Sequence, residues 1–236
     1  MKLKRKYPRS SGVLLPITSL HGPLGIGVLG AEAREFIDFL CEAGFHAWQV
    51  LPVEHTGTCN SPYKCISAFA GEPMLIDPRM LLEMGLITED ELAERIHGMS
   101  EGYVEYELIR IKQWRLMKKA FQRLDDKPYK DFDPFWFQEY AIYISLKHHF
   151  ENEPWYDWTD KGLRSHDENA LNNARDKFGT EIEFHRFVQW LFDLQWQKLR
   201  LLRAWRILSD NVLRGLCDGV HLYTKAVKEP AMLPWR

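Results

Sequence analysis

The sequence predicts an α/β fold built on parallel strands. Residues 12–17 (GVLLPI) and 48–53 (WQVLPV) are short apolar runs of the kind that form buried strands. Residues 31–43 between them carry apolar side chains at helical spacing. A strand, a helix and a strand within about forty residues form a βαβ unit, which indicates a parallel sheet or a barrel.

The composition excludes several classes of protein. The chain has 236 residues, of which 45% are hydrophobic and 27% charged, and a formal net charge of -2, so nothing favours nucleic acid or an anionic membrane as a partner. The first nine residues are basic, but no apolar run follows them, so they do not form a secretory signal. No stretch approaches the roughly 20 apolar residues of a membrane span. We therefore expect a cytoplasmic protein.

The cysteines predict neither a zinc site nor disulfides. Cys41, Cys59, Cys65 and Cys217 match no paired zinc or CxxC spacing. His55, Cys59 and Cys65 could be drawn as a metal site, but no second ligand pair has suitable spacing, so we expect no metal. Reduced thiols are the rule in a cytoplasmic protein.

The segment after the first strand reads as a strand-to-helix loop. Residues 18–30 contain four glycines and Pro23. Residues 25–30 (GIGVLG) match the three glycines of a dinucleotide-binding fingerprint. No strand with an acidic end follows at the required distance, so a nucleotide site is not predicted. The helix at residues 31–43 then ends at Gly44, a common stop residue.

The loop at residues 52–77 (PVEHTGTCNSPYKCISAFAGEPMLID) is the candidate ligand-binding segment. It follows the second strand, and α/β proteins place ligand contacts in loops at the carboxyl ends of their strands. It contains turn-forming residues and two aromatics, Tyr63 and Phe69. The alternative is a packed loop held by these aromatics. The many aromatic residues of the chain are likewise compatible with core packing or with carbohydrate binding.

A long helical stretch follows residue 77. Thr88 and Glu91 form the T-x-x-E pattern of a capping box. Residues 154–158 (PWYDW) read as an aromatic turn. We predict a mainly helical layer on one side of the βαβ unit, with helices at residues 78–84, 88–97, 103–124, 132–150 and 168–178.

The last readable element is a helix at residues 181–203, which has a broad apolar surface. His185 lies among its apolar residues, where it is either a packed core histidine or a ligand-binding one. Residues 206–209 are predicted to begin a third strand. From residue 211 no coherent pattern is visible.

Seven segments in one order give the chain a resemblance to a known family. Together they resemble the N-terminal part of the 4-α-glucanotransferases, also called amylomaltases or disproportionating enzymes, over roughly residues 10–200. The segments are SGVLLPITSL (11–20), GIGVLG (25–30), FLCEAGFHAWQVLPV (39–53), SPYKCISAFAGEPMLID (61–77), YAIYISLK (140–147), PWYDW (154–158) and EIEFHRFVQWLF (181–192).

This resemblance implies a fold, a reaction and a partner. The family resembles α-amylase in having a (β/α)8 TIM barrel with helical insertions. Its members transfer α-1,4-glucan segments between maltooligosaccharides with retention, using an aspartate nucleophile and a glutamate acid/base, as retaining glycoside chemistry requires. A second aspartate stabilises the distorted sugar, and no cofactor is needed.

The resemblance implies substrate contacts but no catalytic residue. The family's carboxylate segments, R-I-D-H-F-R-G, A-E-D-L-G and H-D-N, do not occur here, and we assign no role to Asp210 or Asp218. Ser61 and Tyr63 match the family's SPY motif beside the glucan groove. Asn60 stands where the family usually has Asp, and it remains able to bind a sugar or cap the turn. We therefore predict Asn60, Ser61 and Tyr63 as substrate-binding residues.

Other positions also depart from the family pattern. Glu72 replaces a usual Asn, which puts an amide contact there in doubt, and His21 and Leu24 replace a usual Pro and Tyr. The segment RILSDNVL (206–213) only faintly matches the family's RIIGDIPI, and the resemblance then ends. We expect a truncated chain with an incomplete barrel, caused by a frameshift near residues 200–210.

The expected organisation has four parts. Residues 1–77 hold the first βαβ part of the barrel and the substrate loop, 78–178 a helical insertion, 179–210 the next barrel helix and the start of a strand, and 211–236 an unmatched tail. We expect this chain to be inactive in glucan transfer; the alternatives are a non-catalytic glucan-binding remnant and a chain with no stable fold. Because strand edges would be open, we expect partial folding, self-association or insolubility.

Overall fold

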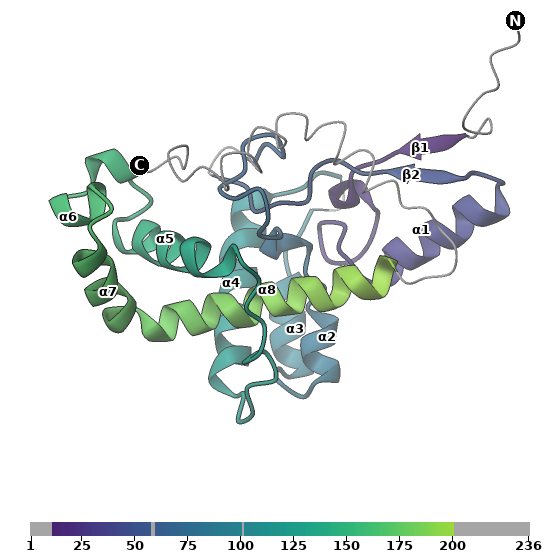
Figure 1. Cartoon of the computed structure of the whole chain (residues 1–236). Helices are drawn as coiled ribbons and strands as arrows, with labels where there is room; N and C mark the ends of the chain where they lie inside the picture. The colour runs from purple at the N-terminus through teal and green to yellow at the C-terminus, as the bar shows by residue number, and fades with distance from the viewer. Residues whose placement is uncertain (1–10, 58–59, 101, 201–236) are drawn as a thin grey trace, which may run out of the picture.

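The computed structural model describes residues 11–200 apart from residues 58, 59 and 101 (Figure 1). Strands β1 (Gly12–Leu14) and β2 (Ala47–Gln49) pair in parallel, with Val13 opposite Trp48. Helix α1 (Ala31–Glu42) connects them and packs on β2. The predicted βαβ unit is therefore confirmed.

Both strands are shorter than predicted, and β1 is less buried. Leu15 still donates its N–H to the carbonyl of Gln49 at 3.0 Å, but Pro16 has no N–H to continue the ladder. Leu14 is 56% exposed, so the prediction of a buried first strand was wrong. In the described part of the chain the sheet has two strands, and β1 has no further neighbour on its other edge. On β2, by contrast, Trp48 is fully buried and donates its indole N–H to the carbonyl of Leu15.

The other regular elements of the described chain are helices, and no strand occurs in the described part of residues 78–178, as predicted. Helix α5 begins five residues later than expected because Pro134 precedes its first turn. The helices are η1 (Ile17–Ser19), η2 (Pro73–Leu75), α2 (Arg79–Glu83), α3 (Glu89–Ile96), α4 (Tyr106–Gln122), α5 (Phe137–His149), η3 (Trp155–Asp157), α6 (Lys161–Arg164), α7 (Glu168–Lys177) and α8 (Gly179–Arg200), where η denotes a 3-10 helix.

The capping box predicted at the start of α3 is present. The Thr88 hydroxyl accepts the N–H of Glu91 at 3.3 Å, and the Glu91 carboxylate accepts the N–H of Thr88 at 3.0 Å. Two of the otherwise unsatisfied N–H groups at this helix start are therefore paired.

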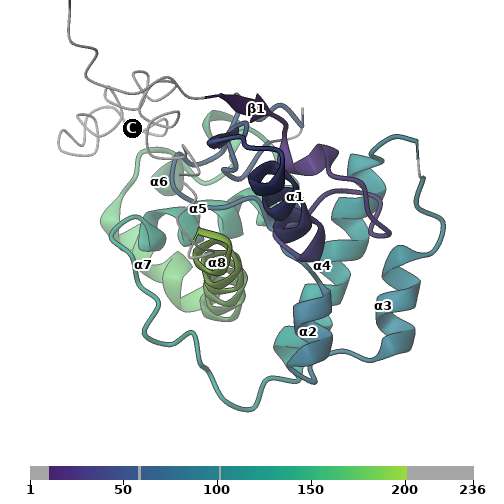
Figure 2. The same cartoon turned by 90° about the vertical axis from the view of Figure 1, so that its right-hand side faces the viewer.

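Helix α8 lies in the middle of the helical layer. It contacts α4, α5, α7 and η2, and Figure 2 views it nearly end-on between α5 and α4. One hydrophobic core joins α8 to the βαβ unit through Ile37, Trp48, Met117, Phe187 and Leu191, among others. The helices thus cover one side of the small sheet and share its core. The division of the chain at residues 77 and 178 stays a prediction.

Several predictions lie outside the described residues. These are the strand at residues 206–209, the tail at 211–236, and the positions of Asp210 and Asp218. None of the helices described by the structure is long and apolar enough to cross a membrane.

Candidate functional site

The loop that follows β2 folds back on itself. Isolated antiparallel bridges pair Glu54 with Gly71 and Thr56 with Cys65. The N–H of His55 bonds to the carbonyl of Ala70 at 2.7 Å. At the tip, the N–H of Lys64 bonds to the carbonyl of Ser61 at 3.0 Å, closing a turn around the SPY motif. The loop is therefore a two-sided backbone structure with the predicted substrate residues at its far end.

Two glutamines of α8 hold the returning side of this loop. The Gln189 amide accepts the N–H of Gly71 at 2.8 Å and donates to its carbonyl at 3.0 Å. Gln195 makes the same pair of bonds to Asp77, again at 2.8 and 3.0 Å. All four bonds are buried. A Cβ at Gly71 would lie 2.1 Å from the Phe192 ring, so this close approach requires glycine.

Glu72, one of the departures from the family pattern, is used inside the loop. Its carboxylate is buried and accepts both the N–H and the hydroxyl of Thr56, each at 2.7 Å, and the N–H of Met74 at 3.2 Å. It stabilises the loop backbone in the way expected of a buried carboxylate with several donors.

The structure places the three predicted substrate residues on one turn. The side chains of Asn60 and Ser61 make hydrogen bonds within the protein, so only that of Tyr63 is fully available to a ligand. Asn60 accepts a bond from Arg110 at 2.5 Å and donates to Glu107 at 3.4 Å, both on α4. Its φ of 54° lies in the left-handed region that Asn tolerates. The Ser61 hydroxyl accepts the N–H of Tyr63 at 3.4 Å. The Tyr63 ring is 61% exposed.

Phe69 of the same loop packs against two aromatic residues from the segment before α5, a contact that the sequence analysis did not predict. Phe69 stacks on Trp136 with ring centroids 6.4 Å apart and an interplanar angle of 11°, and meets Phe135 edge-on at 5.1 Å. Phe135 is 72% exposed. Phe135 and Trp136 were predicted to lie inside the helix at residues 132–150. Pro134 is the signal that places them in the segment before α5 instead.

Glu54 was also missed. It lines a cavity of about 50 Å³ together with Thr56, Asn60, Glu72 and Tyr106. Its Oε2 atom is buried and has no hydrogen-bond partner among the described residues, and burial raises the pKa of its carboxyl. The sequence signal that could have identified Glu54 is a charged residue directly after a predicted buried strand.

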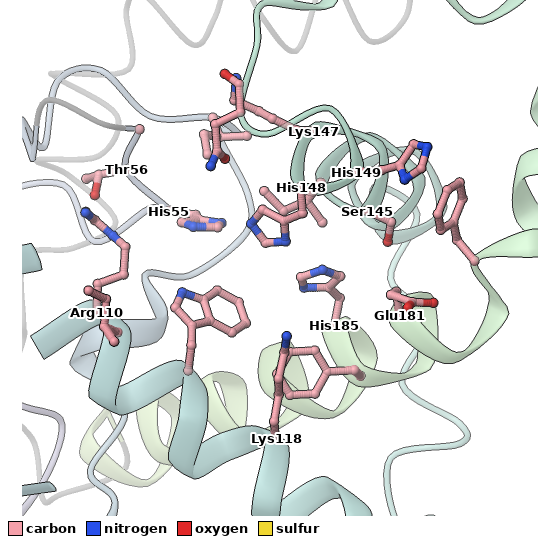
Figure 3. Close-up of a pocket in the computed structure, with 18 of the residues that line it drawn as sticks. His55, Thr56, Arg110, Lys118, Ser145, Lys147, His148, His149, Glu181 and His185 are labelled. Carbon is pink, nitrogen blue, oxygen red and sulfur yellow. The ribbon is translucent and has the colours of Figure 1, made fainter. Parts of the chain in front are cut away.

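A larger cavity of about 580 Å³ lies between the loop and helices α4, α5 and α8. His55, His148 and His185 line it and turn their rings toward the hollow (Figure 3). His55 Nδ1 shares a 2.8 Å hydrogen bond with the Tyr140 hydroxyl. The Trp114 ring meets the rings of His148 and His185 edge-on at 5.8 and 5.7 Å.

His185 has features of both alternatives left open by the sequence. It is only 2% exposed, as a core residue would be, yet it lines the cavity and its Nδ1 is buried without a hydrogen-bond partner. Burial lowers the pKa of His55 and holds that of His185 well below its usual range. Both imidazoles are therefore neutral at pH 7.

The structure does not describe all three candidate metal ligands, His55, Cys59 and Cys65. Cys59 lies outside the described residues, and Cys65 is exposed. In the part of the chain that the structure covers, no group of three or more His, Cys, Asp or Glu side chains is placed to hold a metal ion.

Comparisons with known proteins show what the chain is similar to. A family model described as 4-alpha-glucanotransferase matches residues 15–205. The 4-alpha-glucanotransferase of Thermus thermophilus is 40% identical over 205 residues, which cover 83% of this chain and 40% of that protein. The 4-alpha-glucanotransferase of Aquifex aeolicus is 41% identical over 198 residues, which cover 81% of this chain and 40% of that protein.

A solved structure shows a similarity to the same family. The amylomaltase from Streptococcus agalactiae in complex with acarbose matches with a TM-score of 0.76 and 36% identity, covering 81% of this chain and 40% of that chain. The chain therefore spans about 40% of the length of these relatives.

Proposed function

Because the chain belongs to the 4-alpha-glucanotransferase family, we propose that its described part forms a glucan-binding portion of an α-amylase-like (β/α)8 barrel with a helical insertion. In this proposal β1, α1 and β2 are the first barrel elements, and the loop after β2 lies along a groove for α-1,4-glucans or maltooligosaccharides. The acarbose bound to the amylomaltase relative, a ligand of that protein, supports an oligosaccharide as the ligand here. We also infer a cytoplasmic location.

The observation that carries the proposal is the exposed Tyr63 ring on a fixed turn. Arg110 anchors the adjacent Asn60, and Gln189 anchors the base of the loop at Gly71. A ring held in this way loses little freedom when a ligand covers it, which favours binding. The apolar face of a pyranose lies well on such a flat ring. Phe135, exposed beside the same loop, offers a second surface of the same kind.

The transfer reaction is proposed for the family enzyme, and for these 236 residues we propose glucan binding without turnover. Retaining chemistry requires two carboxyl groups about 5 Å apart. The family's carboxylate segments do not occur in this sequence. Glu54 and Glu72 face one small cavity, but Glu72 is already bonded within the loop.

Binding of maltoheptaose to the chain, measured by calorimetry, tests the proposal. We expect saturable binding that weakens about tenfold, or about 1.4 kcal/mol, in Tyr63→Ala. Tyr156→Ala is the matched control, because Tyr156 is 59% exposed but lies on η3, outside the loop. Equal losses in the two variants, or no binding by the parent chain, would contradict the proposal.

Disproportionation of maltotriose, followed by chromatography of the products, tests the absence of turnover. Formation of glucose and longer maltooligosaccharides by the purified chain would show that it contains the reacting carboxylates after all.

A further inference from the structure

The large cavity has a basic end that the glucan proposal does not use. His148 and His185 face each other there, with ring centroids 5.5 Å apart. His148 is exposed to the cavity, whereas His185 is buried with an unpartnered Nδ1. In Figure 3 the ammonium group of Lys118, on α4, points toward His185.

The charges around this end are mostly positive. Lys147 donates from Nζ to the carbonyls of Asn152 and Glu153 at 2.8 and 3.4 Å, and it forms no ion pair with a carboxylate among the described residues. Burial first, then the neighbouring His148, His55 and Lys118, lower the pKa of His185. Although part of the His148 ring is accessible from the cavity, the surrounding protein atoms first, then His55, Lys118 and Lys147, lower its pKa to about 4. Within the described residues, no carboxylate offsets these effects at either ring.

The carboxylates near the cavity are either bonded to other groups or exposed. Glu107 forms a 2.6 Å ion pair with Arg110. Glu72, which acts on His55, is bonded to Thr56. Glu181 lines the rim and is exposed, in the first turn of α8. Its charge is therefore screened by solvent more than a buried charge would be.

We propose that this cavity binds a small phosphate-bearing molecule, with its phosphate group between His148, His185 and Lys118. A tetrahedral dianion accepts hydrogen bonds from imidazole N–H groups and from an ammonium group, and such charge-assisted bonds are strong in a partly buried site. The cavity volume falls within the range of about 300–1,000 Å³ typical of small-molecule sites. Its remaining walls, including Trp114 and Thr56, contact the organic part of the ligand. The cavity borders the loop after β2, but its lining does not include Asn60, Ser61 or Tyr63, and this proposal does not depend on glucan binding at those residues.

Binding is coupled to proton uptake. The two imidazoles are held neutral by burial and by positive neighbours, and a dianion between them favours their protonated forms. Lowering the pH therefore strengthens binding, by up to about tenfold per pH unit for each proton taken up.

The test uses the full chain with sulfate and glucose 6-phosphate as probes and glucose as the neutral counterpart, at constant ionic strength. Sulfate keeps its charge between pH 6 and 7.5, so its pH dependence reports on the protein alone. We expect saturable shifts of the His148 and His185 ring signals in NMR spectra, glucose 6-phosphate binding at least about tenfold tighter than glucose, and sulfate affinity rising about threefold to tenfold from pH 7.5 to 6.

Lys118→Gln is the decisive variant, with Lys119→Gln as its control. Lys118 is exposed, so its replacement leaves the fold intact. Lys119 is the next residue on α4 but pairs with Glu91 and Glu94 of α3, away from the cavity. We expect Lys118→Gln to weaken sulfate binding at least about fivefold and Lys119→Gln to leave it unchanged.

Four results would overturn the proposal. Three of them are equal affinities for glucose 6-phosphate and glucose, sulfate binding that is independent of pH, and equal losses in the Lys118 and Lys119 variants. Ring signals of His148 and His185 that do not respond to sulfate would show that any bound anion lies elsewhere.

Discussion

Gln189 bonds to both backbone groups of Gly71 across 118 residues of sequence. The side-chain amide accepts from the glycine N–H and donates to its carbonyl, so it acts like a neighbouring strand at this one position. The Nε2 group also lies 3.4 Å from the Tyr140 hydroxyl, which in turn bonds to His55. The base of the loop after β2 is thus connected to α8, α5 and the histidine cavity.

Gln189→Leu is expected to destabilise the protein by about 1–3 kcal/mol, because it leaves the buried N–H and C=O of Gly71 without partners. Urea unfolding followed by tryptophan fluorescence measures this loss. Gln197→Leu, on the exposed side of the same helix, should change stability by less than about 0.5 kcal/mol. Equal effects in the two variants would show that the Gln189 bonds do not stabilise the loop.

Gly71→Ala is expected to cost about 1–3 kcal/mol, because the added methyl group overlaps the buried Phe192 ring and forces the core to shift. Thermal melting of the two glycine variants makes the comparison. In Gly179→Ala, at the start of α8, the new methyl group meets no atom within 4 Å, so this control should be neutral or slightly stabilising. An unchanged melting temperature for Gly71→Ala would mean that the loop does not approach α8 this closely.

Arg79→Met is expected to destabilise the fold by about 1–3 kcal/mol, with a smaller effect in high salt. Arg79 bonds to both oxygens of Glu32 on α1, at 2.8 and 2.5 Å, and to Asp77 at the end of the loop. Its guanidinium lowers the pKa of Glu32 through these hydrogen bonds. Urea unfolding at low and high sodium chloride tests the prediction.

The control is Arg115→Met. Arg115 makes an exposed 3.6 Å contact with Glu94, so its replacement should change the stability very little. A salt-independent loss in Arg79→Met would assign its effect to packing.

Stability is expected to fall as the pH drops below about 6.5. The pKa of His185 is lowered well below its usual 6.5 by burial, so the unfolded chain binds more protons than the folded one in this range. The contribution of this histidine is fully present above pH 6.5 and is lost toward its folded pKa, at up to about 1.4 kcal/mol per pH unit. Urea unfolding between pH 7.5 and 5.5 should therefore give a shallower pH slope for His185→Gln than for the parent. Parallel slopes would show that His185 takes up protons equally readily in the folded and unfolded states, contrary to a lowered pKa.

The sequence predicted the order and type of the main elements because their signals are local. The capping pair Thr88 and Glu91 and the apolar run around Trp48 each lie within a few residues, where periodicity and helix-start chemistry act. The limits of β1 were less accurate, because the burial of Leu14 depends on neighbours that the strand itself does not specify.

The site was predicted only in part, because its contacts join distant segments. The SPY turn was located from its motif, and Tyr63 and Ser61 lie on it. That Asn60 would bond to Arg110, 50 residues away, has no local signal. His55, His148 and His185 come from three separate segments, and only packing brings them to one cavity. The glucan contacts of Asn60, Ser61 and Tyr63 stay a prediction.

The sequence separation between Gln189 and Gly71, and between Gln195 and Asp77, has a consequence for synthesis of the protein. The backbone groups of Gly71 and Asp77 each form hydrogen bonds with a glutamine 118 residues further along the chain. At a ribosomal rate of roughly 5–20 residues per second, about 6–24 s pass before that partner is made. During this interval the apolar surface of the βαβ unit, including Trp48 and Ile37, lacks the helix that completes its core. The nascent chain therefore keeps this apolar surface uncovered until α8 leaves the ribosome.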